Sequence, residues 1–185
     1  MMREKKRIST GTIVTVGMFT AVLGVLSILT IPMPSGVPIT LQTFAMALCG
    51  YVLGAKKGIS ATLIYILLGT VGVPVFAGMM AGPSRLFGYT GGFIWGFLIL
   101  VALCGLGIGQ KKVIFRISFG MLGLVVCHSI GVVQYSMVAE CQLLPAFVTV
   151  SLPYIIKDML SVIGAYLVAM PVRKALKRNS NASSY

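Results

Sequence analysis

Six long apolar runs, separated by short breaks that carry charged residues or glycine and proline, dominate the pattern of hydrophobic and polar positions. A helix needs about 20 residues to cross the hydrocarbon core of a bilayer, with a range of about 17–25. The runs are close to this length, and they lack the period-two alternation of membrane β-strands. The predicted membrane-spanning helices cover residues 13–31, 39–55, 59–75, 91–109, 113–137 and 146–172.

Charged residues lie almost entirely between these runs. No Asp, Glu, Lys or Arg occurs from Ile8 to Ala55, whereas a soluble domain has about a quarter of its residues charged. Each charge in hydrocarbon costs about 2.5–3.5 kcal/mol, so we expect the chain to be embedded in a bilayer. With the N-terminus in the cytoplasm, all but two of the 15 lysines and arginines fall on the inner side, as the positive-inside rule requires.

The pattern therefore predicts an all-α, polytopic membrane protein with six transmembrane helices and both termini in the cytoplasm. Residues 1–178 are expected to form a single substrate-binding domain in the membrane, and residues 179–185 a polar, disordered tail. The net charge of +12 does not indicate nucleic-acid binding, because the basic residues lie at the ends of apolar runs rather than along one face. The four cysteines have no C-x-x-C spacing and are expected to be unpaired.

Lys157 and Asp158 break the segregation of charge, since they lie inside the sixth apolar run. Asp158 precedes Arg173 by 15 residues, or about 22 Å of helix, which places the pair in the outer third of the membrane. Adjacent helical residues point about 100° apart, so we expect that the two side chains do not simply neutralise each other and that at least one faces a polar cavity or another partner. The alternative is a helix that starts at Pro153 and leaves the pair at the wet interface.

The outer loops contain one further basic residue, Arg85. It lies in the glycine- and proline-rich segment from Pro74 to Thr90, which is either a lid over the helices or a plain connector. Asp158 offers two acceptor oxygens, Lys157 offers three donors, and Arg85 offers a planar fork suited to a carboxylate or phosphate. Together they fit an elongated small anion whose polar head has both N–H donors and a carbonyl, such as a cyclic urea.

Several uncharged positions are weaker candidates. Thr40 and Gln42 open the second run, where helix capping explains Thr40 better than Gln42. A lone histidine such as His128 is more often hydrogen-bonded inside the protein than bound to a ligand. Aromatic residues can either line an apolar slot near the outer face or anchor the protein at the interface; they include Tyr65, Phe76, Phe87, Tyr89, Phe93 and Trp95.

Motifs for catalysis or energy conversion are missing from the sequence. It has no G-x-x-x-x-G-K-[ST] motif for ATP, no cluster of metal-ligating residues and no defensible Ser-His-Asp arrangement. We therefore expect a binding protein that is not an enzyme and that needs no metal or cofactor. Gly17 and Ala21 form a small-xxx-small spacing on the first helix, which suits close approach of another helix, either from a partner or within the bundle.

Three stretches carry a resemblance to a known family, namely Pro38-Ile-Thr-Leu-Gln-Thr-Phe44, Leu68-Gly-Thr-Val-Gly-Val-Pro-Val-Phe-Ala-Gly78 and Thr90-Gly-Gly-Phe93. They resemble the biotin-specific S component (BioY family) of energy-coupling factor transporters, and the resemblance covers most of the chain. It implies that the ligand is bound by the loop between helices one and two, the loop between helices three and four, and the start of helix six. The charge pattern independently indicates the same regions.

The resemblance extends to single residues, with some departures. Asp158 matches the aspartate that holds the ureido ring in that family. The family reads Gly-Asp-x-x-Lys where this chain has Lys157-Asp158 and Ser161, so Lys157 would supply the ammonium from the other side. Gly17-x-x-x-Ala21 replaces the usual Ala-x-x-x-Ala as the surface that docks the coupling subunit. The predicted binding residues are Thr40, Gln42, Phe76, Gly78, Arg85, Tyr89 (in place of a family proline), Phe93, Lys157 and Asp158.

These observations predict a high-affinity biotin-binding subunit in the plasma membrane of a bacterium. Asp158 would accept the ureido N–H bonds, Lys157 or a nearby donor would meet the ureido oxygen, and Arg85 would meet the valerate carboxylate. Uptake would need a separate transmembrane coupling protein and two ABC-type ATPases. The alternatives are an S component for another vitamin, a stand-alone secondary carrier, and a small intramembrane enzyme that uses Lys157 and Asp158 as acid and base.

Overall fold

The computed structural model describes residues 9–34 and 36–182, and most of them are helical. The helices are α1 (Thr10–Ile28), α2 (Gln42–Thr70), α3 (Ser84–Phe87), α4 (Gly91–Gly107), α5 (Val113–Val138), α6 (Leu143–Val150) and α7 (Leu152–Ala182). A short 3₁₀ helix, η1 (Ala77–Met79), precedes α3, and the strands β1 (Thr30–Ile31) and β2 (Ile39–Thr40) follow α1.

The second and third predicted runs are joined in α2, which is interrupted at Gly54. This glycine has φ 77° and ψ 171°, a conformation that side-chain-bearing residues rarely adopt. Just before it, Nη1 of Arg173 donates to the carbonyl oxygens of Tyr51 (3.2 Å) and Val52 (2.8 Å). The guanidinium thus satisfies carbonyls that the interruption leaves without helical partners. A Cβ at Gly105 of α4 would overlap the backbone of Ala55, so α2 and α4 approach closely at this point.

The sixth predicted run is divided between α6 and α7. Its expected span, 146–172, was wrong at the outer end, because the chain turns at Ser151 and α7 begins at Leu152. Pro153 lies in the first turn of α7, where the missing N–H costs no hydrogen bond. At its other end α7 continues to Ala182, so residues 179–182 extend this helix, and residues 183–185 lie outside the described part.

The break after the first run forms a β-hairpin that the apolar pattern did not indicate. Strands β1 and β2 are antiparallel, with Thr30 opposite Thr40 and Ile31 opposite Ile39. The prolines between the strands cannot donate ladder hydrogen bonds, so pairing is confined to the base of the hairpin. The hairpin places Thr40 two residues before the start of α2, where it lines a cavity at this end of the molecule.

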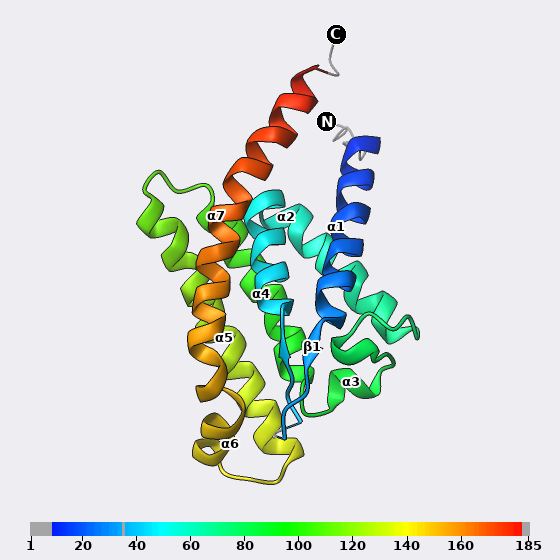
Figure 1. The fold of residues 1–185 in the computed structure, drawn as a ribbon, viewed down its shortest axis with the longest axis vertical. Helices are drawn as coiled ribbons and strands as arrows, with labels where there is room; N and C mark the ends of the chain where they lie inside the picture. The colour runs from blue at the N-terminus through cyan, green and yellow to red at the C-terminus, as the bar shows by residue number, and fades with distance from the viewer. Residues whose placement is uncertain (1–8, 35, 183–185) are drawn as a thin grey trace, which may run out of the picture.

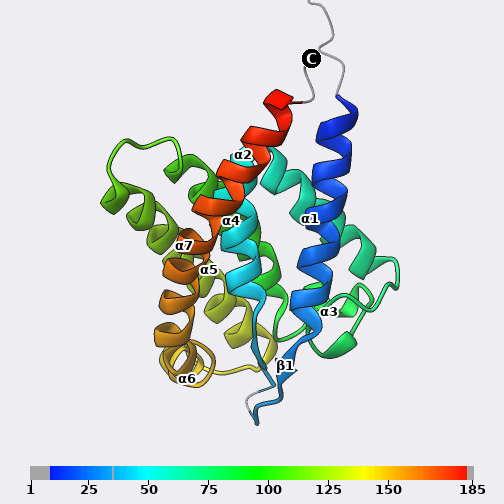
Figure 2. The same cartoon turned by 45° about the horizontal axis from the view of Figure 1, so that its top comes forward.

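Figures 1 and 2 show how the helices are arranged. Helix α4 packs between α2 and α5, α1 packs against α2, and α7 packs against α2 and α5. The start of α1 and the end of α7 lie at one end of the molecule, together with the interruption in α2 and the α4–α5 connection. The hairpin, α3 and α6 lie at the opposite end. The segments that carry the basic clusters are thus separated from those that carry Arg85 and the hairpin.

Four described helices are long and apolar enough to cross a membrane: Thr10–Ile28, Gln42–Thr70, Val113–Val138 and Leu152–Leu176. Helix α4 is shorter, with 17 residues, and is also apolar. Large apolar side chains lie on the outside of these helices, for example Val14, Leu67, Leu122 and Leu160. Such an exterior is stable against lipid and not against water.

Candidate functional site

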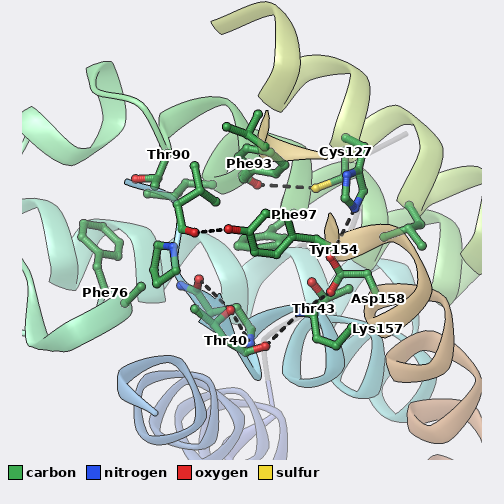
Figure 3. A pocket seen from close by; sticks show the side chains of 18 of the residues that line it. Thr40, Thr43, Phe76, Thr90, Phe93, Phe97, Cys127, Tyr154, Lys157 and Asp158 are labelled. Carbon is green, nitrogen blue, oxygen red and sulfur yellow. Dashed lines mark hydrogen bonds and ion pairs between the residues drawn. The ribbon is translucent and has the colours of Figure 1, made fainter. Parts of the chain in front are cut away.

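One cavity lies at the end of the molecule that carries the hairpin, and it is enclosed by segments far apart in the sequence (Figure 3). Its volume is about 70 Å³. The lining residues come from the hairpin, the start of α2, the 71–90 segment, α4, α5, α6 and α7; they are Val37, Pro38, Thr40, Gln42, Thr43, Phe76, Ala77, Arg85, Thr90, Phe93, Ile94, Phe97, Leu124, Cys127, His128, Val150, Tyr154, Lys157 and Asp158.

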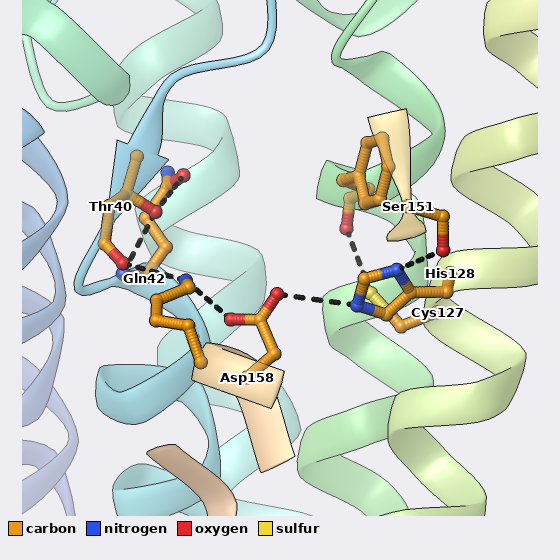
Figure 4. A network of polar contacts seen from close by, with 8 residues as sticks. Thr40, Gln42, Cys127, His128, Ser151 and Asp158 are labelled. Carbon is orange, nitrogen blue, oxygen red and sulfur yellow. Dashed lines mark hydrogen bonds and ion pairs between the residues drawn. The ribbon is translucent and has the colours of Figure 1, made fainter. Parts of the chain in front are cut away.

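Asp158 is the buried acid of this cavity. It lies in the second turn of α7, and 5% of its surface is exposed. Its Oδ2 is 3.3 Å from Nε2 of His128, and its Oδ1 is 2.5 Å from Nζ of Lys157 (Figure 4). No described donor makes an aligned hydrogen bond with Oδ1, although a carboxylate oxygen accepts two. The acid is therefore held from two sides, and its buried Oδ1 retains acceptor capacity.

Lys157 folds back onto its neighbour, contrary to the expectation from the 100° offset of adjacent residues. Its stem is long enough to bring Nζ to both Asp158 Oδ1 and the carbonyl oxygen of Thr40, at 3.0 Å. The side chain is 31% exposed, whereas that of Asp158 is 7% exposed. The ammonium thus connects α7 to the hairpin at the mouth of the cavity. The pair is not left at a wet interface, because the carboxylate is almost completely enclosed.

The two polar residues at the start of α2 serve different purposes. The Thr40 hydroxyl accepts a hydrogen bond from the backbone N–H of Gln42 at 3.2 Å. The N-cap residue of α2 is Leu41, however, so Thr40 is not the helix cap that one interpretation of the sequence expected. The Gln42 side chain instead donates to the Tyr65 hydroxyl at 2.9 Å. Both residues line the cavity, and the Tyr154 hydroxyl of α7 donates to the carbonyl of Val37 in the hairpin.

The segment after α2 brings Phe76 and Arg85 to the cavity. Phe76 is 2% exposed and packs edge-to-face on Tyr65, with ring centroids 5.7 Å apart. Arg85 lies in α3, whose end is held by Gln134 of α5: its Nε2 donates to the carbonyls of Leu86 and Gly88, both at 2.9 Å. Long-range hydrogen bonds from α5 therefore hold the end of α3, whereas the rest of this segment contains little regular structure.

Two of the nine predicted binding residues do not line the cavity. Gly78 occupies η1 with φ 68°, so its position is set by the turn. Tyr89 is 47% exposed and packs on Tyr135, with ring centroids 5.4 Å apart. The other seven, namely Thr40, Gln42, Phe76, Arg85, Phe93, Lys157 and Asp158, lie around one cavity.

His128 is the most informative lining residue that the predicted set omitted. Sequence reasoning placed it in an apolar helix and favoured an internal hydrogen bond, which it does make, with Ser151 Oγ at 2.7 Å from Nδ1. Its other nitrogen faces Asp158. In the sequence, the only indication of a role for His128 is that it is a single histidine in an apolar run. Nothing local in the sequence connects it to Asp158, 30 positions later.

The predicted docking residues lie away from the cavity, on the outer side of α1. Gly17 and Ala21 are exposed, and a Cβ at Gly17 would meet no atom within 4 Å. The buried face of α1 is formed by other residues, among them Phe19 and Leu23. The small-xxx-small spacing had two interpretations, docking of a partner and packing within the bundle. Packing within the bundle therefore does not account for Gly17.

Comparisons with known proteins agree on one family. The profile of the BioY family matches residues 2–178. The biotin transporter BioY of Thermotoga maritima is 34% identical over 164 residues, covering 88% of this chain and 95% of that protein. The probable biotin transporter BioY of Pyrococcus horikoshii is 38% identical over 133 residues, covering 72% and 78%.

A solved structure shares the fold. The crystal structure of an S-component for biotin from an ECF-type ABC transporter superposes with a TM-score of 0.82. The alignment covers 91% of this chain and 95% of that chain, at 23% sequence identity.

Proposed function

The chain belongs to the BioY family, and we propose that it is the high-affinity biotin-binding subunit of an energy-coupling factor transporter. It is a multi-pass membrane protein and a transporter component rather than an enzyme. The names of its relatives in Thermotoga maritima and Pyrococcus horikoshii support biotin as the cargo. These relatives include archaeal as well as bacterial proteins, so residence in a bacterial plasma membrane stays a prediction.

The observation that carries the proposal is the set of unused donors and acceptors at the Lys157–Asp158 pair. The Lys157 ammonium has three donors, of which one faces Thr40 O and one faces Asp158, so one remains. Asp158 Oδ1 remains an available acceptor beside it. A cyclic urea presents a carbonyl flanked by N–H groups, which complements a donor next to an acceptor. Biotin carries this group in its ureido ring.

The rest of the cavity suits the other parts of biotin. Phe76, Phe93 and Phe97 provide apolar walls for the thiophane ring. Arg85 lines the same cavity, and no ion pair joins its guanidinium to a described acid. A guanidinium binds a carboxylate through two parallel hydrogen bonds, so we assign the valerate carboxylate to Arg85.

Binding requires the cavity to widen. Ligand pockets usually have volumes of about 300–1,000 Å³, whereas this cavity has about 70 Å³. The hairpin and the 71–90 segment are the parts of the wall that are least regular in structure. We propose that both move outward to admit biotin and close over it afterward, which makes the 71–90 segment a lid rather than a connector.

We propose six membrane crossings with both termini in the cytoplasm. The two arms of α2 on either side of Gly54 would be separate crossings, and α4, at 17 residues, is about 26 Å long, close to the hydrocarbon thickness. The segments with the basic clusters lie at the end where α1 begins, which supports placing that end in the cytoplasm. Arg85 and the cavity then face outward.

Ligand titration tests the proposed cargo directly. The purified protein in detergent is expected to bind biotin and desthiobiotin, which both carry the ureido ring. Lipoate, which has a similar acid chain and no ureido group, is expected to bind at least about 100-fold more weakly, because the half-buried Lys157 and the buried Asp158 would lose their partners. Isothermal titration gives the affinities, and a panel of other vitamins provides the control. Tighter binding of another vitamin would contradict the proposal.

Uptake is proposed to depend on a partner that docks on α1. The partners would be a transmembrane coupling protein and two ABC-type ATPases, since this chain carries no ATP-binding motif. Gly17 and Ala21 give a smooth, exposed helix surface, which permits close approach of a partner helix.

Gly17→Leu is expected to separate binding from transport. The added side chain would keep a partner helix at a distance, and uptake in cells that express the complete transporter should fall about tenfold. Biotin affinity of the purified variant should stay unchanged, because Gly17 lies on the exposed side of α1 and does not line the cavity. Gly11→Leu is the matched control, since a Cβ at Gly11 also meets nothing within 4 Å. Equal uptake by both variants and the wild type would exclude Gly17 from the docking surface.

A further inference from the structure

His128 occupies a fixed position between the binding cavity and the junction of α6 and α7. Its Nε2 is 3.3 Å from Asp158 Oδ2, and its Nδ1 is 2.7 Å from Ser151 Oγ (Figure 4). The ring packs edge-on against Phe93, with centroids 5.7 Å apart and planes at 89°. Only 8% of the residue is exposed. The ring is thus held on three sides, and one of its nitrogens faces the acid of the binding site.

The chemistry of the three groups fixes the proton positions. An ionised carboxylate only accepts hydrogen bonds, so the proton on the His128 side of the contact belongs to Nε2. In the neutral ring, Nδ1 then accepts from the Ser151 hydroxyl. The carboxylate thus selects the tautomer that presents an N–H group to it, and Ser151, whose hydroxyl can donate or accept, holds the opposite side of the ring in place, in the way that an outer partner orients a histidine at many functional sites.

Ser151 is itself a rigid anchor. It is completely buried, and its backbone N–H donates to the carbonyl of Phe147 at 3.0 Å. Its carbonyl accepts from the N–H groups of Tyr154 (2.9 Å) and Ile155 (3.1 Å) in the first turn of α7. The hydroxyl is thus fixed relative to the helix that carries Asp158, and His128 connects this anchor to the carboxylate.

We propose that His128 is a positioning residue for ligand recognition, which holds Asp158 Oδ2 on the α5 side so that Oδ1 stays directed at the N–H donors of the cargo. This inference rests on the proposed binding of biotin. The Lys157 ammonium lies 2.5 Å from Oδ1 and attracts the whole carboxylate. With His128 removed, Lys157 and Thr43 would be the remaining described partners of the carboxylate. The carboxylate would then turn toward the ammonium, and the acceptor that the ureido group needs would be lost.

Three variants test this role by biotin titration. His128→Phe keeps a ring of similar size against Phe93 and removes both polar contacts; biotin should bind about tenfold more weakly. His128→Gln retains an amide N–H near the position of Nε2 and should restore affinity to within about threefold of the wild type. Ser151→Ala removes only the outer partner and should cost about threefold. The thermal midpoint of each ligand-free variant checks that it is folded.

A double-mutant cycle with Asp158→Asn separates positioning from a general structural effect. If His128 acts through Asp158, His128→Phe should cause little further loss in the Asp158→Asn background. A tenfold loss that persists in that background, or no loss in His128→Phe alone, would overturn the inference. If His128→Phe does not fold, the same cycle is carried out with Ser151→Ala. Wild-type protein that fails to bind biotin would reject the proposed function and this inference together, whereas normal binding by the wild type and by His128→Phe rejects the inference alone.

Discussion

Asp158→Asn is expected to weaken biotin binding by about 100- to 1,000-fold. A hydrogen bond to a charged group contributes about 1.5–3 kcal/mol, and the carboxylate is proposed to accept from the ureido N–H groups. The substitution also leaves the half-buried Lys157 ammonium without its counter-charge. Since each 1.4 kcal/mol changes an affinity tenfold, these losses together reach the stated range. Isothermal titration of the purified variant measures the effect.

Glu140→Gln is the matched control for this prediction. It makes the same change from acid to amide at an exposed residue outside the cavity, so its biotin affinity should equal that of the wild type. The thermal midpoint of the ligand-free Asp158→Asn protein distinguishes lost contacts from lost folding. An affinity within threefold of the wild type in a folded Asp158→Asn protein would show that this carboxylate does not hold the cargo.

Lys157→Met is expected to reduce the affinity for biotin by about 10- to 100-fold. Methionine retains most of the apolar stem and removes the ammonium that we assign to the ureido oxygen, a charged hydrogen bond of about 1.5–3 kcal/mol. The link from α7 to Thr40 O is lost as well, so the hairpin should close less firmly and biotin should dissociate faster. Titration gives the affinity, and stopped-flow displacement gives the dissociation rate. Lys174→Met, an exposed position on the same helix, is the control.

Adding Ser161→Lys to Lys157→Met tests why this chain departs from the Gly-Asp-x-x-Lys pattern. Residues 157 and 161 are one helical turn apart and border the same depression on the surface of α7, so they share a helix face. A lysine at 161 can therefore direct its ammonium toward the same region from one turn farther along. We expect the double variant to recover about tenfold in affinity over Lys157→Met. A folded double variant with no recovery would contradict the interpretation that the two positions are equivalent.

The sequence determined most of the helical framework and the family. Apolar runs of membrane-spanning length produced α1, α4 and α5 within a few residues of their predicted limits, because lipid leaves a buried backbone few alternatives to a helix. Local motifs also identified the BioY family, which the comparisons confirm. The sequence alone also identified Lys157 and Asp158 as candidates, because they are charged residues inside an apolar run. Placing a charge in hydrocarbon costs free energy, so such residues usually have a functional role.

Only the tertiary structure decided how these residues are used. The contact between His128 and Asp158, the hydrogen bond from Gln42 to Tyr65 and the anchoring of the Arg85 segment by Gln134 all join residues far apart in the chain. The pairing of the two strands in the hairpin likewise lies where the apolar pattern gives no signal. The break between the second and third apolar runs did indicate the interruption that the structure places at Gly54. Hydrophobic periodicity indicates which surface of a helix faces lipid. It does not specify which polar side chains on two different helices contact each other. That pairing depends on the relative placement of whole helices, which packing alone establishes.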